Sequence, residues 1–160
     1  MTGMSIKKDM LNKIADSIGT MGRRRVLIGI PAPENRRNDE AIGNAGLAYI
    51  HETGSGARNI PARPFLVPGV KKAEASALRV LKDAARKALS GDVKAIDKGL
   101  NAAGLIGQIT VKQTVSRGEG FKPLAESTLA ARRRKGFMGE KPLIRTGQLL
   151  NSITYVVKDK

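Results

Sequence analysis

Two consecutive helices are predicted by KKAEASALRVLKDAARKALS (residues 71–90) and DVKAIDKGLNAAGLIGQITVKQTV (residues 92–115). In the first segment apolar residues recur at intervals of three and four with Lys and Arg between them, which is typical of an amphipathic helix. Gly91 is a suitable C-terminal stop for that helix. Gly104 and Gly107 weaken the helix prediction in the later part of the second segment. We expect the two helices to pack as an antiparallel hairpin.

Two short segments outside this hairpin predict strands. RVLIGI (residues 25–30) is apolar and rich in β-branched side chains, and Pro31 bounds it. ITYVV (residues 153–157) has the same character. A length of 160 residues leaves room for one domain, so we expect residues 1–160 to form a single domain of helices and strands.

Shorter helices are predicted on both sides of the hairpin, over residues 4–18, 40–52, 127–134 and the turn 147–152. Gly19 and Gly22 are expected to end the first of them, and Asn38 or Asp39 to cap the second. The third lies within residues 117–141, which are rich in Gly and charge. We expect this segment to form an extended, flexible arm.

The composition narrows the classes of function. Lys and Arg number 29 against 14 Asp and Glu, a net charge of +15, which favours contact with polyanions or acidic protein surfaces. Cys is absent, which excludes disulfides, thiol nucleophiles and thiolate metal sites. No segment has the run of about 18 apolar residues that a transmembrane helix needs, so we expect no membrane contact and synthesis in the cytoplasm.

Catalytic groups are few. His51 is the only histidine, and its neighbour Glu52 projects about 100° away around a helix, so the two cannot readily share a proton. We therefore predict no enzymatic activity, no metal and no cofactor, and a polar or interface role for His51. A small hydrolase that uses His51 is the least favoured alternative.

Two segments are more distinctive than the rest. In IPARPFLVP (residues 60–68) three prolines preset an extended backbone, and the segment also carries an apolar anchor and a fixed charge. In LIRTGQLLNSI (residues 143–153) Thr146 can cap a turn that leads into the last strand. Both segments can be rigid connectors, but a stiff segment with an anchor also suits the grip of one subunit on another. We expect contacts with a neighbouring subunit or partner from Arg63, Pro64, Phe65 and Leu66.

The basic residues include one dense cluster. Arg132, Arg133, Arg134 and Lys135 are consecutive, while the remaining positive charge is spread along the chain. The cluster and Arg145 are predicted to contact acidic surfaces of a partner. The same cluster can contact phosphates without reading sequence, which leaves sequence-independent DNA binding as an alternative function.

The two distinctive segments and their surroundings resemble a known family. AYIHETG (residues 48–54), followed by residues 60–68, is similar to the Y-x-x-H/E-x-G … I-P-A-R-P-F-L segment of tail-completion and head-tail joining proteins of tailed bacteriophages. PLAESTL (residues 123–129), followed by KPLIRTGQLLNSI (residues 141–153), resembles their second signature, P-L-x-x-x-T-L … L-x-x-T-G-x-L-x-x-S-I. In this chain the second signature follows the first, whereas in the best-known members it precedes it.

This resemblance implies an α+β fold in which a small antiparallel sheet packs against helices, with extended loops or arms. It implies a structural role without catalytic residues or cofactors, in which copies form a ring, commonly a hexamer, that completes or terminates the tail. The implied partners are the tail tube protein and a head-tail connector or head-closure protein, and genomic DNA passes through the ring. The implied location is the neck of the virion, which is assembled in the host cytoplasm.

Overall fold

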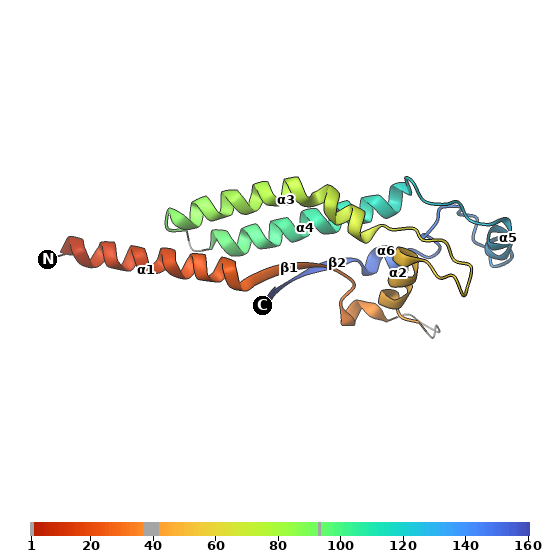
Figure 1. The fold of residues 1–160 in the computed structure, drawn as a ribbon, viewed down its shortest axis with the longest axis horizontal. Helices are drawn as coiled ribbons and strands as arrows, with labels where there is room; N and C mark the ends of the chain where they lie inside the picture. The colour runs from red at the N-terminus through yellow and green to blue at the C-terminus, as the bar shows by residue number, and fades with distance from the viewer. Residues whose placement is uncertain (1, 37–41, 93) are drawn as a thin grey trace.

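The chain folds into an elongated molecule with α1 at one end and α5 at the other (Figure 1). The computed structural model describes residues 2–36, 42–92 and 94–160. The elements follow one another as α1 (Thr2–Arg23), β1 (Arg24–Gly29), the 3-10 helix η1 (Ala32–Asn35), α2 (Asn44–Thr53), α3 (Leu66–Leu89), α4 (Ala95–Arg117), α5 (Glu126–Arg134), α6 (Gln148–Ser152) and β2 (Thr154–Asp159).

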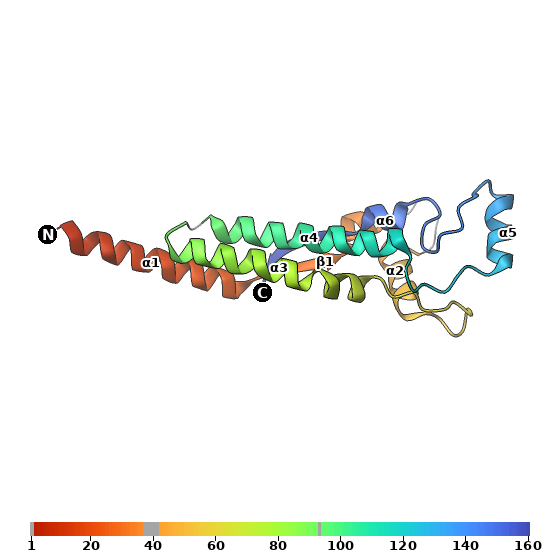
Figure 2. The same cartoon turned by 90° about the horizontal axis from the view of Figure 1, so that it is seen from above.

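Helices α3 and α4 lie side by side as an antiparallel hairpin (Figures 1 and 2), which confirms the prediction. Small residues let the two backbones approach closely, since a Cβ added at Gly69 would come within 2.8 Å of the Cα of Val111. Helix α3 ends at Leu89. Gly91 follows with a φ of +102°, a conformation that glycine adopts readily, so the predicted stop is also confirmed.

The sheet consists of β1 and β2, which pair antiparallel from Arg24 opposite Asp159 to Gly29 opposite Thr154. Both strands lie where the sequence predicts them. The combination of helices with a small antiparallel sheet confirms the expected α+β fold.

The glycines that weaken the helix prediction are the positions where α4 meets this sheet. A Cβ added at Gly104 would collide with the ring of Tyr155, and one added at Gly107 would collide with Ile28. Glycine lowers helix propensity at these positions, but it allows the strands to pack closely against the helix. Tertiary packing outweighs the propensity, and α4 continues to Arg117.

Two apolar clusters form the core along α4. The larger one contains the buried side chains of Phe65, Val111, Val115, Leu143, Leu149 and Ile153. The smaller one contains Ala88, Ile96 and Leu100, against which Val26, Leu81 and Val157 pack. The larger cluster includes side chains from residues 60–68 and from residues 143–153, so the two distinctive sequence segments meet in space.

Helix α3 begins inside the segment that its prolines predict to be extended. The Glu52 carboxylate accepts three backbone N–H groups at the start of the helix, at distances of 2.7, 2.9 and 3.0 Å; they belong to Phe65, Leu66 and Val67. Pro68 has no N–H and is tolerated in the first turn. The first four backbone amide positions of a helix have no carbonyl partner within the helix, and all four are thus accounted for here. The prediction of an extended backbone is therefore wrong from Leu66 onward.

Helix α1 is longer than the sequence predicts. It passes through Gly19 and Gly22, neither of which has a positive φ, and continues to Arg23. A glycine weakens a helix by about 1 kcal/mol relative to alanine, but it ends the helix only where the backbone turns away. The prediction that these glycines end the helix is wrong.

Helix α2 begins at Asn44, a few residues after the predicted start. Its first turn is capped by Asn35, the last residue of η1, whose Oδ1 accepts the N–H of Ala45 at 2.7 Å. The predicted caps Asn38 and Asp39 lie outside the described residues. Helix α2 ends at Thr53, one residue beyond the predicted end, and Gly54 follows as its C-cap with a φ of +80°.

Candidate functional site

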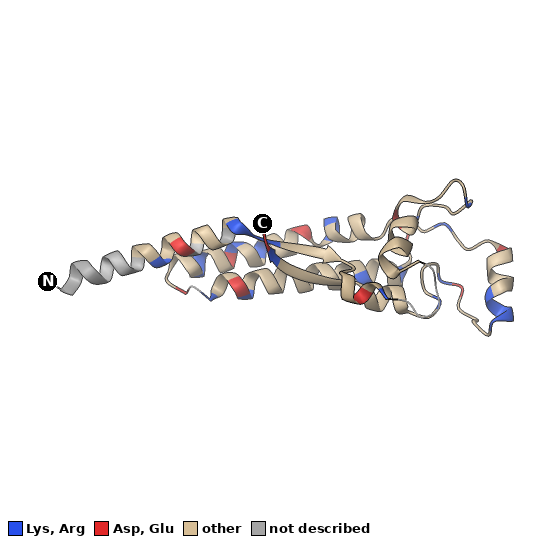
Figure 3. Ribbon diagram, turned by 90° about the horizontal axis from the view of Figure 1, so that it is seen from below, with Lys and Arg blue, Asp and Glu red and all other residues tan. Residues whose placement is uncertain are grey.

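Helix α5 stands away from the body on an arm, residues 118–147, at the end of the molecule opposite α1 (Figures 1 and 2). The helix confirms the prediction over residues 127–134, and none of its residues is buried. Figure 3 shows Lys and Arg gathered at one end of α5. The flexibility of the arm remains a prediction.

Arg132 holds the two sides of the arm together. Its Nη1 donates to three backbone carbonyl oxygens at 2.8, 3.0 and 3.1 Å; they belong to Gly139, Lys141 and Ile144. Burial lowers the pKa of the Arg132 guanidinium, and the positive charges of Arg145 and Arg63 lower it further. The guanidinium of Arg132 therefore lies close enough to those of Arg63 and Arg145 to be repelled by both.

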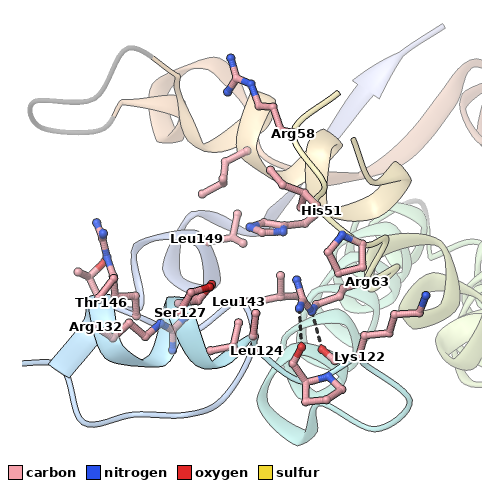
Figure 4. Close-up of a pocket in the computed structure, with 18 of the residues that line it drawn as sticks. His51, Arg58, Arg63, Lys122, Leu124, Ser127, Arg132, Leu143, Thr146 and Leu149 are labelled. Carbon is pink, nitrogen blue, oxygen red and sulfur yellow. Dashed lines mark hydrogen bonds between the residues drawn. The ribbon is translucent and has the colours of Figure 1, made fainter. Parts of the chain in front are cut away.

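Arg63 ties the loop before α3 to the start of the arm. The residue is 5% exposed; its Nε donates to the carbonyl oxygen of Lys122 at 2.7 Å and its Nη2 to that of Pro123 at 2.9 Å (Figure 4). Burial lowers the pKa of its guanidinium. Arginine nevertheless keeps its charge at neutral pH. The two carbonyl oxygens accept hydrogen bonds from Nε and Nη2 of Arg63 without neutralising that charge.

A pocket of about 870 Å³ lies between the arm and the body (Figure 4). Six of its lining side chains are basic: Arg58, Arg63, Lys122, Arg132, Lys135 and Arg145. Others are apolar: Leu47, Ile60, Pro61, Leu124, Ala131, Leu143 and Leu149. None of the described residues in its lining is Asp or Glu. Within the described part of the chain, the lining therefore carries several basic side chains and no acidic one.

The structure divides the predicted contact residues between the pocket and the open surface. Four of the basic ones line the pocket: Arg63, Arg132, Lys135 and Arg145. Three others are exposed and do not line it: Pro64, Arg133 and Arg134. Arg133 forms an ion pair with Glu126 at 2.9 Å. The consecutive basic residues of α5 thus have different surroundings.

Phe65 is not the exposed anchor that the sequence predicts. It is 1% exposed and belongs to the same buried cluster as Val111 and Ile153. Leu66 is half-buried as the first residue of α3. An aromatic residue between prolines is compatible with a core position as well as with an interface. In this structure the side chain of Phe65 is buried in the core of its own chain. The prediction of an exposed anchor at Phe65 is therefore wrong.

His51 lies half-buried in the wall of the pocket (Figure 4). The side chain of its neighbour Glu52 serves a different purpose, since it caps α3. Within residues 2–36, 42–92 and 94–160, no three His, Asp or Glu side chains gather as metal ligands would. The lining in the described part of the chain contains no Asp or Glu beside His51.

Two basic lining residues, Arg58 and Lys122, carry no signal in the sequence. Both are single cations in loops, and only the return of the arm toward the body brings them to one pocket. The contact that joins their segments, between Arg63 and Lys122, spans 59 residues. Local patterns do not report contacts at such separations.

No helix in the described part of the chain is long and apolar enough to cross a membrane. Neither a protein-family model, nor a curated protein, nor a solved structure matches the chain. A functional conclusion therefore depends on the residues, on their geometry and on the family resemblance of the two segments.

Proposed function

We propose that the chain is a structural protein of the neck of a tailed bacteriophage, where copies form a ring that completes or terminates the tail and joins it to the head. The ring is hexameric in this proposal. It contacts the tail tube protein on one side and a head-tail connector or head-closure protein on the other. The protein performs no reaction, uses no cofactor and is assembled into particles in the host cytoplasm.

The meeting of the two family-like segments is the observation that carries this proposal. Phe65 from the first segment and Leu149 and Ile153 from the second share one buried cluster. Arg63 and Arg145, again one from each segment, line one pocket. Because the segments build a common core, either order along the chain can supply the same contacts. The reversed order in this chain is therefore compatible with the resemblance.

The shape of the molecule also supports a role in assembly. The arm and α1 extend from opposite ends of the body (Figures 1 and 2). Helix α5 has no buried residue, and on α1 Leu11 and Ile18 are 65% and 56% exposed. Segments that bury little of their surface within their own chain leave the exposed part available for contacts with neighbouring subunits, which a ring requires.

Deletion of the gene tests the proposal. In the phage or prophage that encodes the chain, we expect filled heads and separate tails in electron micrographs of lysates, because both parts are made but are not joined. Expression of the intact chain from a plasmid should restore whole particles. Normal yields of infectious particles without the gene would refute a role in the neck.

A second candidate function is sequence-independent DNA binding. Three exposed cations at the end of α5 favour it: Arg133, Arg134 and Lys135 (Figure 3). This function predicts that affinity for any duplex falls steeply with salt, and that R133Q with R134Q makes that dependence shallower. Affinity that responds neither to salt nor to these substitutions would exclude it.

A further inference from the structure

We infer that the basic pocket binds an acidic segment of a neighbouring protein, in which carboxylates alternate with apolar side chains. The inference deepens the proposed function and rests on it for the source of the segment. The binding itself depends only on the pocket.

The charge of the pocket selects an anion. Six basic side chains line it, from the loop before α3, from the arm and from the segment that leads into α6. No Asp or Glu of the described chain shares the lining with them. Arg63 and Arg132 donate to carbonyl oxygens, and among the described residues neither forms an ion pair with Asp or Glu. A ligand that brings carboxylates lowers this repulsion.

The guanidinium groups also keep donors for such a ligand. Among the described residues, Arg132 bonds to the arm through Nη1, so its Nε and Nη2 remain for a ligand. Arg63 uses Nε and Nη2, so its Nη1 remains. A carboxylate accepts two parallel N–H donors from one guanidinium group. The pocket can therefore both attract and orient a carboxylate.

The lining between the cations favours a peptide over a nucleic acid. Leu124, Leu143 and Leu149 are among the apolar lining residues, and they match apolar side chains better than sugars and phosphates. No Phe or Tyr of the described chain lines the pocket, whereas binding of single strands relies on aromatic stacking. A duplex carries its phosphates on a convex surface, which cannot enter a pocket of about 870 Å³.

The segment comes from a different protein rather than from another copy. The chain has a net charge of +15, so a second copy approaches the pocket with the same sign of charge. An adjoining ring of acidic character supplies the complementary charge. The proposed neck partner is therefore expected to carry an exposed acidic segment.

The test uses the purified chain and a fluorescein-labelled octapeptide of alternating Glu and Leu. The test variant combines Lys122→Gln with Lys135→Gln, which removes two exposed cations from the lining. The control combines Arg117→Gln with Arg134→Gln, which removes the same charge from exposed positions outside the pocket. In fluorescence anisotropy we expect the test variant to weaken binding about fivefold to tenfold and the control less than about twofold.

Three results would overturn the inference. Equal weakening of peptide binding by the test variant and by the control variant would show that affinity depends on net charge and not on the pocket. Equal binding of a peptide with Gln in place of every Glu would remove the role of carboxylates. Tighter binding of a labelled oligonucleotide, with the same loss in the test variant, would assign the pocket to nucleic acid. All three results are measured on the isolated chain. They can therefore be distinguished from the result that would refute the neck role, which is normal joining of heads and tails after gene deletion.

Discussion

The hairpin end and the arm end of the molecule are stabilised by different interactions. Near the turn between α3 and α4, the buried apolar side chains include Ala88, Ile96 and Leu100, which pack together in the smaller core cluster. At the other end α5 buries nothing, and Arg63 and Arg132 hold the arm through hydrogen bonds to carbonyl oxygens. Packed interiors resist changes of volume, whereas partly exposed hydrogen bonds open locally. The hairpin end is thus held by packing. The arm is anchored in the larger core cluster through Leu143, and hydrogen bonds from Arg63 and Arg132 position its outer part, which carries α5.

Replacement of Phe65 should have the largest effect, because it removes the aromatic ring from the larger core cluster. We expect Phe65→Ala to lower the free energy of unfolding by about 3–5 kcal/mol, measured by urea denaturation. Val67→Ala is the control, since Val67 is 67% exposed and its loss should change stability by less than about 0.5 kcal/mol. A Phe65→Ala protein as stable as the control would contradict the buried placement.

Overfilling the contact between α4 and the sheet should have the next largest effect. Gly104→Val places a branched side chain against the ring of Tyr155, so we expect a loss of about 1–3 kcal/mol in thermal or urea denaturation. Gly139→Ala is the control in the arm, where an added Cβ meets nothing within 4 Å. Similar losses of stability in the Gly104→Val and Gly139→Ala proteins would contradict the contrast between a packed body and an open arm.

Removal of Arg132 should loosen the arm and leave the hairpin unchanged. Arg132→Met loses three hydrogen bonds from a charged donor, and we expect the local opening free energy to fall by about 1–2 kcal/mol at this partly exposed site. Hydrogen exchange measured by mass spectrometry should accelerate over residues 118–147 and stay constant in α3 and α4. Arg134→Met should accelerate neither. Faster exchange in the hairpin as well would show that the two ends are one cooperative unit.

Weakening the cap of α3 should have the smallest effect of the four. Glu52→Gln keeps an acceptor oxygen but loses the negative charge at the helix start, so we expect a loss of about 1 kcal/mol in urea denaturation. Glu74→Gln, at an exposed position of the same helix, is the matched control. Equal losses would indicate a general charge effect and not a cap.

The regular elements could be predicted from the sequence because their signals are local. The periodic segment at residues 71–90 and the β-branched segments at residues 25–30 and 153–157 all form the expected structure. The start of α3 could not be predicted in this way. It depends on Glu52, which lies 13 residues before Phe65 and reaches the helix start only after the intervening loop has folded.

The candidate site could be predicted only in part. The sequence singled out Arg63, Arg132 and Arg145 as charged contacts, and the structure brings them to one pocket. It could not separate Arg63 from Phe65, which are two residues apart and face a pocket and a core respectively. Sequence patterns distinguish apolar from charged residues, but whether an apolar residue is buried in its own chain or in a partner depends on the tertiary structure.

Pairing of β1 with β2 joins the first strand of the chain to one that is synthesised much later, so the sheet cannot close until residues 154–159 have left the ribosome. The α3–α4 hairpin contains contacts between segments that follow one another, so it can form while the nascent chain is still growing. Until β2 emerges, Gly104 of α4 lacks the Tyr155 ring that packs against it in the complete chain. A ribosome stalled before β2 would therefore carry a preformed hairpin whose sheet-facing side is open to chaperones.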